Sequence, residues 1–327
     1  MAPTAPSSSA RDRVDRAAHR RAVPGLLDLL RADPATRVVL VREDRVATVP
    51  DGARMRLATP TVGDLGARCE GGPDTLAVLG RWYFLGEDAD GSLIALDLPA
   101  ERPGADLEGF SAVDDAAPLL SDAELVRLRD AGHLLDAHDS DLAHEAVALA
   151  AWHPTAVRCP RCGEPTVLAQ AGWVRRCVVD ELDLYPRTDP AVIMAVLDDS
   201  DRLLLAHAAH WPAARMSTLA GFVEPGESLE QAVRREVAEE VQVEIGAVEY
   251  LGSQPWPFPA SLMLAFRAQA LTTELRPDGV EVTEARWFSR EDLRVAVARD
   301  EVRLPMALSV ARRMIDAWLE GAGPGWR

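Results

Sequence analysis

The stretch that decides the fold is GFVEPGESLEQAVRREVAEEVQV, residues 221–243 of this 327-residue chain. Gly221 and Gly226 flank a tight loop, and Ser228 is a residue type that caps the helix following it. Apolar side chains then recur at helical spacing in a stripe that faces a core: Leu229, Ala232, Val233 and Val237. The stretch therefore predicts a loop and an amphipathic helix over residues 228–241.

Three glutamates of this helix share one face. Glu236, Glu239 and Glu240 stand at i, i+3 and i+4, so their like charges repel one another. The cluster, with Glu227 nearby, is explained if it holds a hard divalent cation such as Mg²⁺, which prefers oxygen ligands. The alternative is an acidic, solvated helix with chance spacing, and the three glutamates alone favour that alternative.

The spacing of the whole stretch changes the balance, because it resembles the Nudix box, Gly-x5-Glu-x7-Arg-Glu-U-x-Glu-Glu-x-Gly-U, where U is a bulky aliphatic residue. The matching positions are Gly221, Glu227, Arg235, Glu236, Val237, Glu239, Glu240 and Val243. Gln242 replaces the last glycine, which would ease the helix exit through a left-handed conformation. That departure concerns the helix exit and not the metal-ligand positions.

The resemblance implies an enzyme that splits X from a nucleoside diphosphate by attack of water on the pyrophosphate, with Mg²⁺ or Mn²⁺. Such ions neutralise charge on phosphate oxygens and activate the water. By resemblance, Glu236 and Glu240 are direct ligands, and Glu239 is a ligand or the base that orients the water. Arg235 is expected to hold Glu227 by a charged hydrogen bond.

The segment SQPWPFPAS, residues 253–261, follows the box. Its prolines exclude an ordinary central strand, because proline lacks the ladder donor. Composition alone equally fits a stiff loop that packs two aromatic side chains into a core. The segment matches the SQPWPFPxS motif of the NADH pyrophosphatase subfamily of Nudix hydrolases, in which it helps to hold the dinucleotide, partly across a dimer interface. The resemblance therefore implies these substrate-binding residues: Gln254, Pro255, Trp256, Pro257, Phe258, Pro259, Ala260 and Ser261.

The resemblance extends to five further positions. Phe222 matches a residue that stacks on a base, and Tyr185 matches an aromatic that closes over the ligand from the partner subunit. Ala220 matches a backbone carbonyl that ligates metal, and Glu281 matches a fourth carboxylate ligand. Ala311 matches a position that lines the substrate. Taken alone, each has an ordinary alternative as a core aromatic, a solvated acid or a packing residue.

Three of the four cysteines lie within residues 155–187. Cys159 and Cys162 form a CxxC, and Asp180 stands where a second CxxC beginning at Cys177 would end. Two such pairs are typical of a zinc ribbon, and the resembled family usually has four cysteines here. Three interpretations are open: Asp180 is an oxygen ligand, another residue completes the site (Cys69 or His153), or no metal binds. A structural zinc is favoured over a redox CxxC, because no helix is expected to begin there.

Strands and helices interleave irregularly elsewhere, which favours an α+β protein or a layered α/β/α domain over a doubly wound sheet. With the resemblance, the expected fold is α+β, a Nudix α/β/α sandwich preceded by a zinc-ribbon-like knuckle and a β-rich N-terminal domain. The expected parts are a disordered tail (1–20), an N-terminal α+β domain (21–154), the knuckle (155–187) and the Nudix domain (188–327). Short apolar runs predict strands at residues 37–41, 75–79, 92–96, 191–197, 203–206, 248–251, 262–268 and 285–288. Further helices are expected at a Ser121/Glu124 capping box, over residues 141–152, and from Pro305 to Gly321.

The composition limits the possible functions. Lys and Arg total 35 and Asp and Glu total 52, a net charge of −17, which argues against broad nonspecific nucleic-acid binding. Hydrophobic residues make up 48%, as in ordinary globular proteins. No apolar run reaches the roughly 18 residues of a membrane span, and the first residues lack the apolar core of a secretory signal. We therefore expect a protein without a membrane partner.

The resemblance implies a homodimeric cytoplasmic enzyme that hydrolyses NADH to reduced nicotinamide mononucleotide and AMP, and NAD⁺ less well. One alternative is a Nudix hydrolase of another nucleotide such as ADP-ribose. A second removes NAD caps from RNA 5′ ends, where only the end of the RNA need enter. A third is a non-enzymatic nucleotide sensor or zinc-knuckle interaction module, which would not need all three of Glu236, Glu239 and Glu240.

Overall fold

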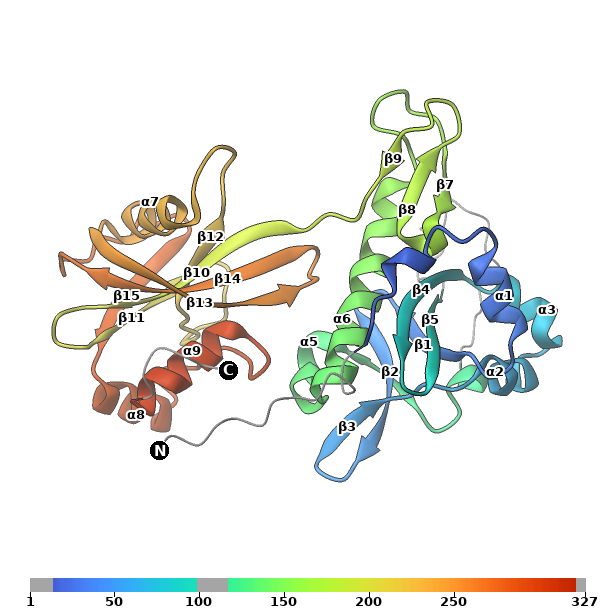
Figure 1. Ribbon diagram of the computed structural model, residues 1–327. Coiled ribbons are helices and arrows are strands. Elements are labelled where there is room, and N and C mark those ends of the chain that lie inside the picture. The colour runs from blue at the N-terminus through green and yellow to red at the C-terminus, as the bar shows by residue number, and fades with distance from the viewer. Residues whose placement is uncertain (1–13, 99–116, 322–327) are drawn as a thin grey trace. The chain divides into compact units, whose positions relative to one another are not determined.

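The computed structural model describes residues 14–98 and 117–321 (Figure 1). The chain divides into two compact units, one comprising Met1–Arg187 with Pro257–Ala260, the other Thr188–Trp256 with Ser261–Arg327. Residues 1–13 of the expected tail lie outside the described part. The tail does not extend to residue 20, because Asp15 pairs with Glu87 through two backbone hydrogen bonds of 2.8 Å and Ala17 is buried.

A six-stranded sheet forms the centre of the first unit, in the order β3-β2-β1-β5-β4 with β6 also on β2. Strand β1 runs parallel to β5, and the other pairs are antiparallel. The elements are η2 Ala18–Arg20, α1 Leu26–Ala32, β1 Arg37–Arg42, β2 Arg45–Asp51, β3 Arg54–Leu57, α2 Val62–Arg68, α3 Gly72–Val78, β4 Arg81–Asp88, β5 Gly91–Asp97, α4 Ala117–Leu120, β6 Glu124–Arg127, α5 Leu128–Ala131, η3 Gly132–Leu134, α6 Ala137–Trp152 and η4 His153–Ala156.

Helices cover both faces of this sheet, because the buried residues of β1 alternate. Val38 and Leu40 pack with α1, α2 and α3, whereas Val39 and Val41 pack with α6. The alanine-rich helix expected over residues 141–152 is present as α6, which begins earlier because the Asp136 side chain accepts from the Asp139 N–H.

Two expectations for the first unit are wrong. Residues 75–79 belong mainly to helix α3 and not to a strand, since Pro73 stands in the first turn and the buried positions, Leu76 and Leu79, are three apart. The Ser121/Glu124 capping box does not form. Ser121 has a left-handed backbone with φ 53°, and Glu124 begins strand β6, which pairs with β2.

The cysteine-rich segment of the same unit is a small antiparallel sheet in the order β7-β8-β9. Its elements are β7 Thr166–Ala169, η5 Gln170–Gly172, β8 Val174–Cys177 and β9 Asp183–Leu184. Cys177 therefore lies at the end of a strand, and Asp180 lies in the turn that leads to the next strand.

The second unit is a mixed sheet in the order β13-β14-β10-β11-β15, with β12 also paired to β10. Its elements are β10 Asp189–Leu197, β11 Leu203–Ala208, β12 Leu219–Phe222, α7 Leu229–Val241, β13 Ile245–Trp256, β14 Ser261–Ala270, β15 Val282–Phe288, α8 Arg290–Ala298 and α9 Val310–Leu319. Alternate residues of β10 face α7 or the α8 and α9 side, and Figure 1 shows these helices on opposite faces of the sheet. The expected α/β/α sandwich is confirmed.

The details of the second unit differ from expectation at two places. Helix α8 was not expected, and the last helix begins at Val310, where the Ser309 side chain accepts from the Arg312 N–H, rather than at Pro305. Gln242 has φ 59° and ψ 31°, the left-handed conformation that glycine would favour at the helix exit. Pro255 lies on β13, an edge strand, where a missing donor is tolerated.

Among the described residues, no helix has the length and hydropathy that crossing a membrane requires.

Candidate active site

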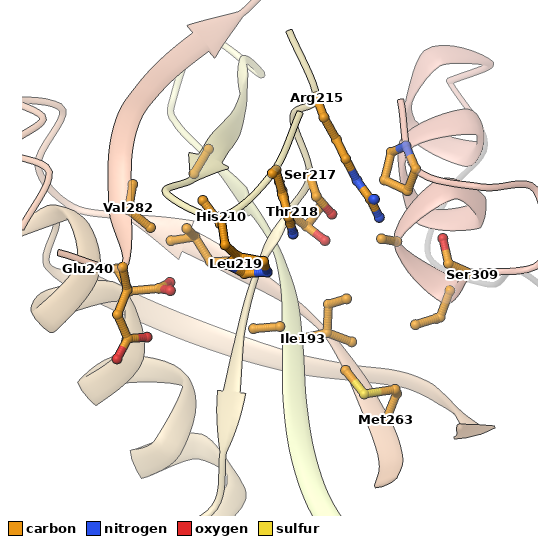
Figure 2. A pocket seen from close by; sticks show the side chains of 18 of the residues that line it. Ile193, His210, Arg215, Ser217, Thr218, Leu219, Glu240, Met263, Val282 and Ser309 are labelled. Carbon is orange, nitrogen blue, oxygen red and sulfur yellow. The ribbon is translucent and has the colours of Figure 1, made fainter. Parts of the chain in front are cut away.

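A cavity of about 540 Å³ opens in the second unit (Figure 2). Its walls come from strands β10 to β14, from the segment between β11 and β12, from the ends of α7 and of the segment before β15, and from the start of α9. The expected site residues that line it are Ala220, Glu240, Gln254, Trp256, Glu281 and Ala311. The structure therefore brings together metal-ligand and substrate positions that are up to about ninety residues apart in the sequence.

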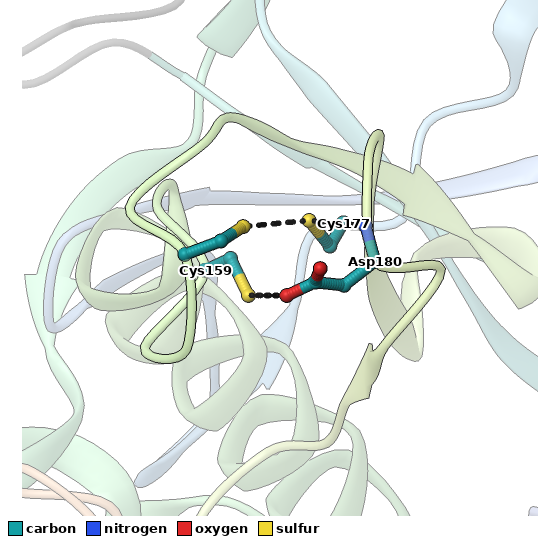
Figure 3. Close-up of side chains that lie close together, drawn as sticks. Cys159, Cys177 and Asp180 are labelled. Atoms are coloured by element: carbon teal, nitrogen blue, oxygen red, sulfur yellow. Dashed lines mark hydrogen bonds between the residues drawn. The ribbon is translucent and has the colours of Figure 1, made fainter.

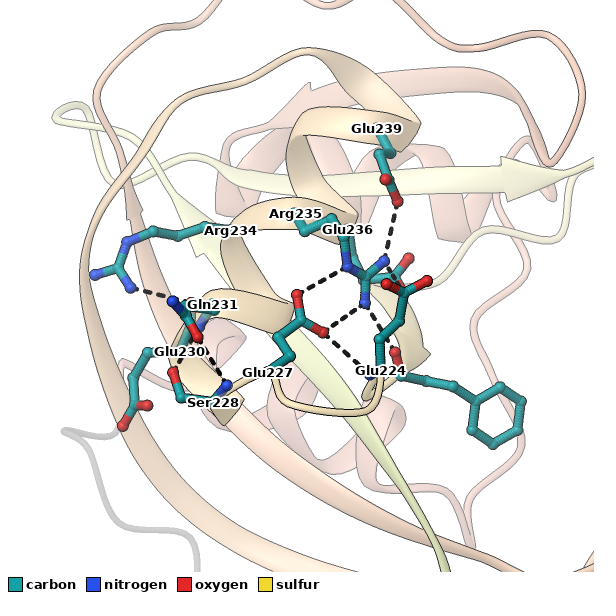
Figure 4. Close-up of polar contacts among 10 residues, drawn as sticks. Glu224, Glu227, Ser228, Glu230, Gln231, Arg234, Arg235, Glu236 and Glu239 are labelled. Carbon is teal, nitrogen blue, oxygen red and sulfur yellow. Dashed lines mark hydrogen bonds and ion pairs between the residues drawn. The ribbon is translucent and has the colours of Figure 1, made fainter.

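Arg235 connects the glycine-bounded loop to helix α7 (Figure 4). Its Nε and Nη2 donate to the two Glu227 carboxylate oxygens, each at 2.9 Å, and Nη2 also donates to the Phe222 carbonyl at 2.9 Å. Its Nη1 donates to Glu236 at 2.9 Å and to Glu239 at 3.0 Å. The guanidinium lowers the pKa of Glu227 below its usual value. The expected Arg235–Glu227 pair is thus present and is bidentate.

Glu236 occupies space that only a glycine leaves open. A Cβ built on Gly221 of β12 would overlap with the Glu236 carboxylate. Burial is the first cause that raises the pKa of Glu236, with the neighbouring Glu239 and Glu281 charges adding to it. The first glycine of the stretch therefore allows a carboxylate of α7 to lie directly over β12.

Glu240 is the most deeply buried carboxylate of the cluster, with 9% of its surface exposed. Its Oε2 has no hydrogen-bond partner within the described part of the chain. Burial, followed by the charges of Glu236, Glu281 and Asp278, raises its pKa to about 8. A buried carboxylate crowded by other carboxylates is costly unless a cation is present. This donor set, all oxygen and strongly acidic, suits Mg²⁺ or Mn²⁺.

Glu239 is the most exposed of the three glutamates on the shared helix face. The Glu239 side chain is 62% exposed and its hydrogen bond goes to Arg235. Sequence reasoning missed Asp278, whose carboxylate accepts from the N–H groups of Glu281 and Val282 and whose own N–H donates to the Glu240 carbonyl. Asp278 thus fixes the turn that carries Glu281 beside α7, and an Asp followed by Gly279 was its signal as a turn residue.

The SQPWPFPAS residues have separate positions. Gln254 is buried, its Nε2 donates to the Leu308 carbonyl at 2.8 Å, and its Oε1 accepts from the Val310 N–H at 2.7 Å. Pro255 and Ser261 lie in β13 and β14, and Pro257–Ala260 group with the first unit. Of the described motif residues, these do not line the cavity: Pro255, Pro257, Phe258, Pro259, Ala260 and Ser261.

The two aromatic residues expected to hold a base are both on the surface. Phe222 is 59% exposed at the end of β12, and its carbonyl accepts from Arg235. Tyr185 is 62% exposed and belongs to the first unit, just after β9. Their exposure excludes the alternative that they are core aromatics.

The cysteine cluster lies in the first unit (Figure 3). Single ligand atoms of Cys159, Cys162, Cys177 and Asp180 all lie within 4.8 Å of one another. Cys159 Sγ is 3.7 Å from Asp180 Oδ2, and Cys162 Sγ is 3.5 Å from Cys177 Sγ. The Val179 and Asp180 N–H groups donate to Cys177 Sγ and lower the pKa of its thiol. Three sulfur atoms and one carboxylate at this spacing are a donor set that zinc accepts.

The two alternative fourth ligands are engaged elsewhere. His153 is fully buried, its Nε2 donates to the Gly172 carbonyl at 2.9 Å, and Arg175 lies 3.4 Å from its Nδ1. Cys69 follows α2 and packs against the apolar side chains between the first sheet and helices α1, α2 and α3. Of the residues considered, the structure therefore brings only Asp180 to the three cysteines.

Comparisons with known proteins agree with this arrangement. Residues 155–181 match the NADH pyrophosphatase zinc ribbon domain, and residues 187–308 match the NUDIX domain. The NAD-capped RNA hydrolase NudC of Mycobacterium bovis is 44% identical over 206 residues, which cover 60% of this chain and 66% of that protein. The human NAD-capped RNA hydrolase is 37% identical over 187 residues, covering 54% of this chain and 40% of that protein.

The match thus spans slightly less than two thirds of the mycobacterial relative. A solved NUDIX hydrolase from Nitrosomonas europaea has a TM-score of 0.42 at 22% identity, covering 52% of this chain and 96% of that chain. The zinc ribbon match contains the cysteine cluster, and the NUDIX match contains the carboxylate cluster and most of the cavity wall. The chain therefore contains a NUDIX domain over residues 187–308, preceded by an NADH pyrophosphatase zinc ribbon domain over residues 155–181.

Proposed function

We propose that this protein hydrolyses the pyrophosphate bond of NADH, and less well of NAD⁺, to give nicotinamide mononucleotide (reduced from NADH) and AMP. The observation that supports this most is that Glu240 and Glu281 lie in the wall of a cavity that also contains Trp256 and Ala311. One end of the cavity thus offers carboxylates for a metal-bound pyrophosphate, and the rest offers an apolar wall for a base.

The carboxylates of Glu236, Glu240 and Glu281, with the carbonyl of Ala220, would hold Mg²⁺ or Mn²⁺. Bound there, the cation neutralises charge on the phosphate oxygens and lowers the pKa of the attacking water. The unpartnered Oε2 of Glu240 and the glycine that admits Glu236 support this fit.

The chain's own residues supply the remaining functions. Water adds to one phosphorus, the bond from that phosphorus to the bridging oxygen breaks, and two monophosphates result. We assign to Glu239, whose side chain is exposed, the role of the base that accepts the proton of the water and passes it to solvent. Arg235 and Glu227 are positioning residues, because they fix the loop before α7 and orient Glu236 and Glu239.

We also propose that Cys159, Cys162, Cys177 and Asp180 hold one structural zinc, which stabilises a segment with little core of its own. Gln254 would support the cavity wall through its two hydrogen bonds. The substrate roles of the other SQPWPFPAS residues and of Phe222 and Tyr185 are part of the same proposal, together with a homodimer in the cytoplasm.

Removal of NAD caps from RNA 5′ ends is the second candidate function, because the relatives from Mycobacterium bovis and human carry that name. The same bond is cleaved, and only the capped end needs to enter the cavity. Hydrolysis of ADP-ribose and a non-enzymatic sensor role are the remaining alternatives.

A hydrolysis panel tests these functions together. NADH, NAD⁺, ADP-ribose and a short NAD-capped RNA are incubated with Mg²⁺ or Mn²⁺ and the wild-type protein, Glu240→Gln or Glu230→Gln. Glu230 is an exposed glutamate of the same helix and serves as the matched control. We expect AMP from NADH with the wild type and Glu230→Gln and none with Glu240→Gln. Cleavage of ADP-ribose but not NADH would leave only the general Nudix activity, and no cleavage would favour the sensor.

A further inference from the structure

Arg215 lies in the cavity wall on a backbone that is held from both sides. Its carbonyl accepts from His207 Nδ1 at 2.7 Å. The flanking residues are paired with Arg303, whose N–H donates to the Ala214 carbonyl at 2.7 Å and whose carbonyl accepts from the Met216 N–H at 3.1 Å. The backbone position of Arg215 is therefore fixed by the fold.

The guanidinium of Arg215 stacks on the Trp211 ring and keeps one N–H donor, at Nε, without a partner in the described part of the chain. Its central carbon lies 4.8 Å from the centre of the Trp211 ring, a cation–π distance. Its Nε is buried without a hydrogen-bond partner, and within the described residues no carboxylate forms an ion pair with it. A buried donor without a partner is costly, so a ligand that brings an acceptor to this wall gains binding free energy.

The cavity has opposite charges on its two sides. Figure 2 shows Arg215 on one side and Glu240 on the other. The wall also includes the apolar side chains of Ile193, Met263 and Ala311. Thr218 Oγ1, in the same wall, is also buried without a partner among the described residues. A ligand that binds metal through phosphates at Glu240 would thus place a flat ring along the apolar wall, with its polar edge toward Arg215.

We propose that Arg215 is a specificity-determining residue that selects an uncharged ring with a carbonyl acceptor over the positively charged form of the same ring. This rests on the proposed function, in which the two forms are the dihydronicotinamide of NADH and the pyridinium of NAD⁺. Arg215 donates to the carboxamide oxygen of either form but repels the charge of the pyridinium. A like-charge pair about 5 Å apart at a partly buried site is worth about tenfold or more in an equilibrium.

The test compares kcat/KM for NADH and NAD⁺ in the wild type, Arg215→Met, Arg215→Lys and Arg286→Met. Methionine keeps length and removes the charge, and lysine keeps the charge. Arg286 also stacks on an aromatic ring, 4.7 Å from the centre of Phe288, but does not line the cavity, so it is the matched control. Arg215→Gln replaces Arg215→Met if the latter does not fold.

We expect the NADH preference to fall about tenfold in Arg215→Met and to stay within about twofold of the wild type in Arg215→Lys and Arg286→Met. An unchanged preference in a folded Arg215→Met or Arg215→Gln overturns this inference and leaves the proposed function intact. An equal loss for both substrates also overturns it, because the other half of the dinucleotide would then face Arg215. A wild type that cleaves neither substrate overturns both.

Discussion

Replacing Gly221 by alanine is a sharp test of the carboxylate cluster, because the three atoms nearest to the added Cβ all belong to the side chain of Glu236, a proposed metal ligand. The new Cβ would lie 1.8 Å from the Glu236 carboxyl carbon, whereas carbon atoms make contact at about 3.5–4.0 Å. The Glu236 carboxylate must therefore move by more than about 1 Å. It would also leave its 2.9 Å hydrogen bond with Arg235.

The expected effect on activity is larger than the effect on stability. A misplacement of about 1 Å at a reacting centre costs about 100-fold in rate, so we expect at least that loss in kcat/KM for NADH. Overpacking by one methyl group at the end of a flexible side chain costs about 1–3 kcal/mol. Gly221 does not have a positive φ, so backbone strain adds nothing.

The assay measures kcat/KM, the Mg²⁺ or Mn²⁺ concentration for half-maximal rate, and thermal unfolding. Gly246→Ala is the matched control, because its Cβ would lie 3.0 Å from a Leu271 side-chain carbon in the same unit, away from the carboxylates. A second change, Glu236→Asp on the Gly221→Ala background, shortens the displaced side chain and should restore part of the activity. Full activity in Gly221→Ala with a normal metal requirement would refute the assignment of Glu236 as a ligand.

The remaining predictions concern charge and metal. Glu240→Gln should abolish NADH cleavage. With divalent ions removed by a chelator, this variant should unfold at a temperature no lower than the wild type, because it removes a buried, unpartnered carboxylate. A clear drop in the unfolding temperature would contradict the interpretation that Glu240 is held among repelling carboxylates. Burial and then the Arg175 guanidinium hold the pKa of His153 at about 3, from an ordinary 6.5. The unfolded chain thus binds a proton at His153 that the folded chain does not. The free energy of unfolding therefore falls as the pH drops from about 6.5 toward 3, and at pH 5 the loss is about 2 kcal/mol. Urea denaturation at pH 7.5 and 5.0 should show that His153→Asn loses about 2 kcal/mol less than the wild type over this pH change. Asp180→Ala should lower the zinc content measured by mass spectrometry, whereas Asp180→Cys should retain zinc against a stronger chelator, and equal zinc in all three proteins would remove Asp180 as a ligand.

Local patterns in the sequence predicted those parts of the molecule that local patterns control. The short apolar run of β10 and the apolar stripe of α7 predicted these two elements, and the spacing of Glu236 and Glu240 predicted the carboxylate cluster. The sandwich itself was expected from the irregular interleaving of strands and helices and from the resemblance. Residues 75–79 misled because a run of five apolar or β-branched side chains fits a strand and a short buried helix equally well. Gly71 at the N-cap and Pro73 in the first turn favour the helix.

Other features depend on contacts between distant segments, which periodicity does not reveal. Arg215 looks like any surface arginine until the pairing with Arg303 and the stacking on Trp211 place it in the cavity wall. Asp278 is a turn residue by type, and only the fold brings it to the end of α7. The fourth position of the cysteine cluster was open for the same reason. Zinc accepts Asp, His and Cys side chains alike, and only the fold shows that Asp180, and not His153 or Cys69, lies beside the three cysteines.

The position of Gln254 affects how substitutions in its motif should be interpreted. Its amide joins strand β13 to the segment where α9 begins, through the Leu308 carbonyl and the Val310 N–H, so both of its polar atoms are already engaged. A loss of activity on changing Gln254 would then report a shift of the wall that carries Ala311, and not a lost bond to the dinucleotide. Gln254 thus supports the cavity wall, and an inhibitor with a polar group aimed at its amide would compete with the two hydrogen bonds that hold this wall in place.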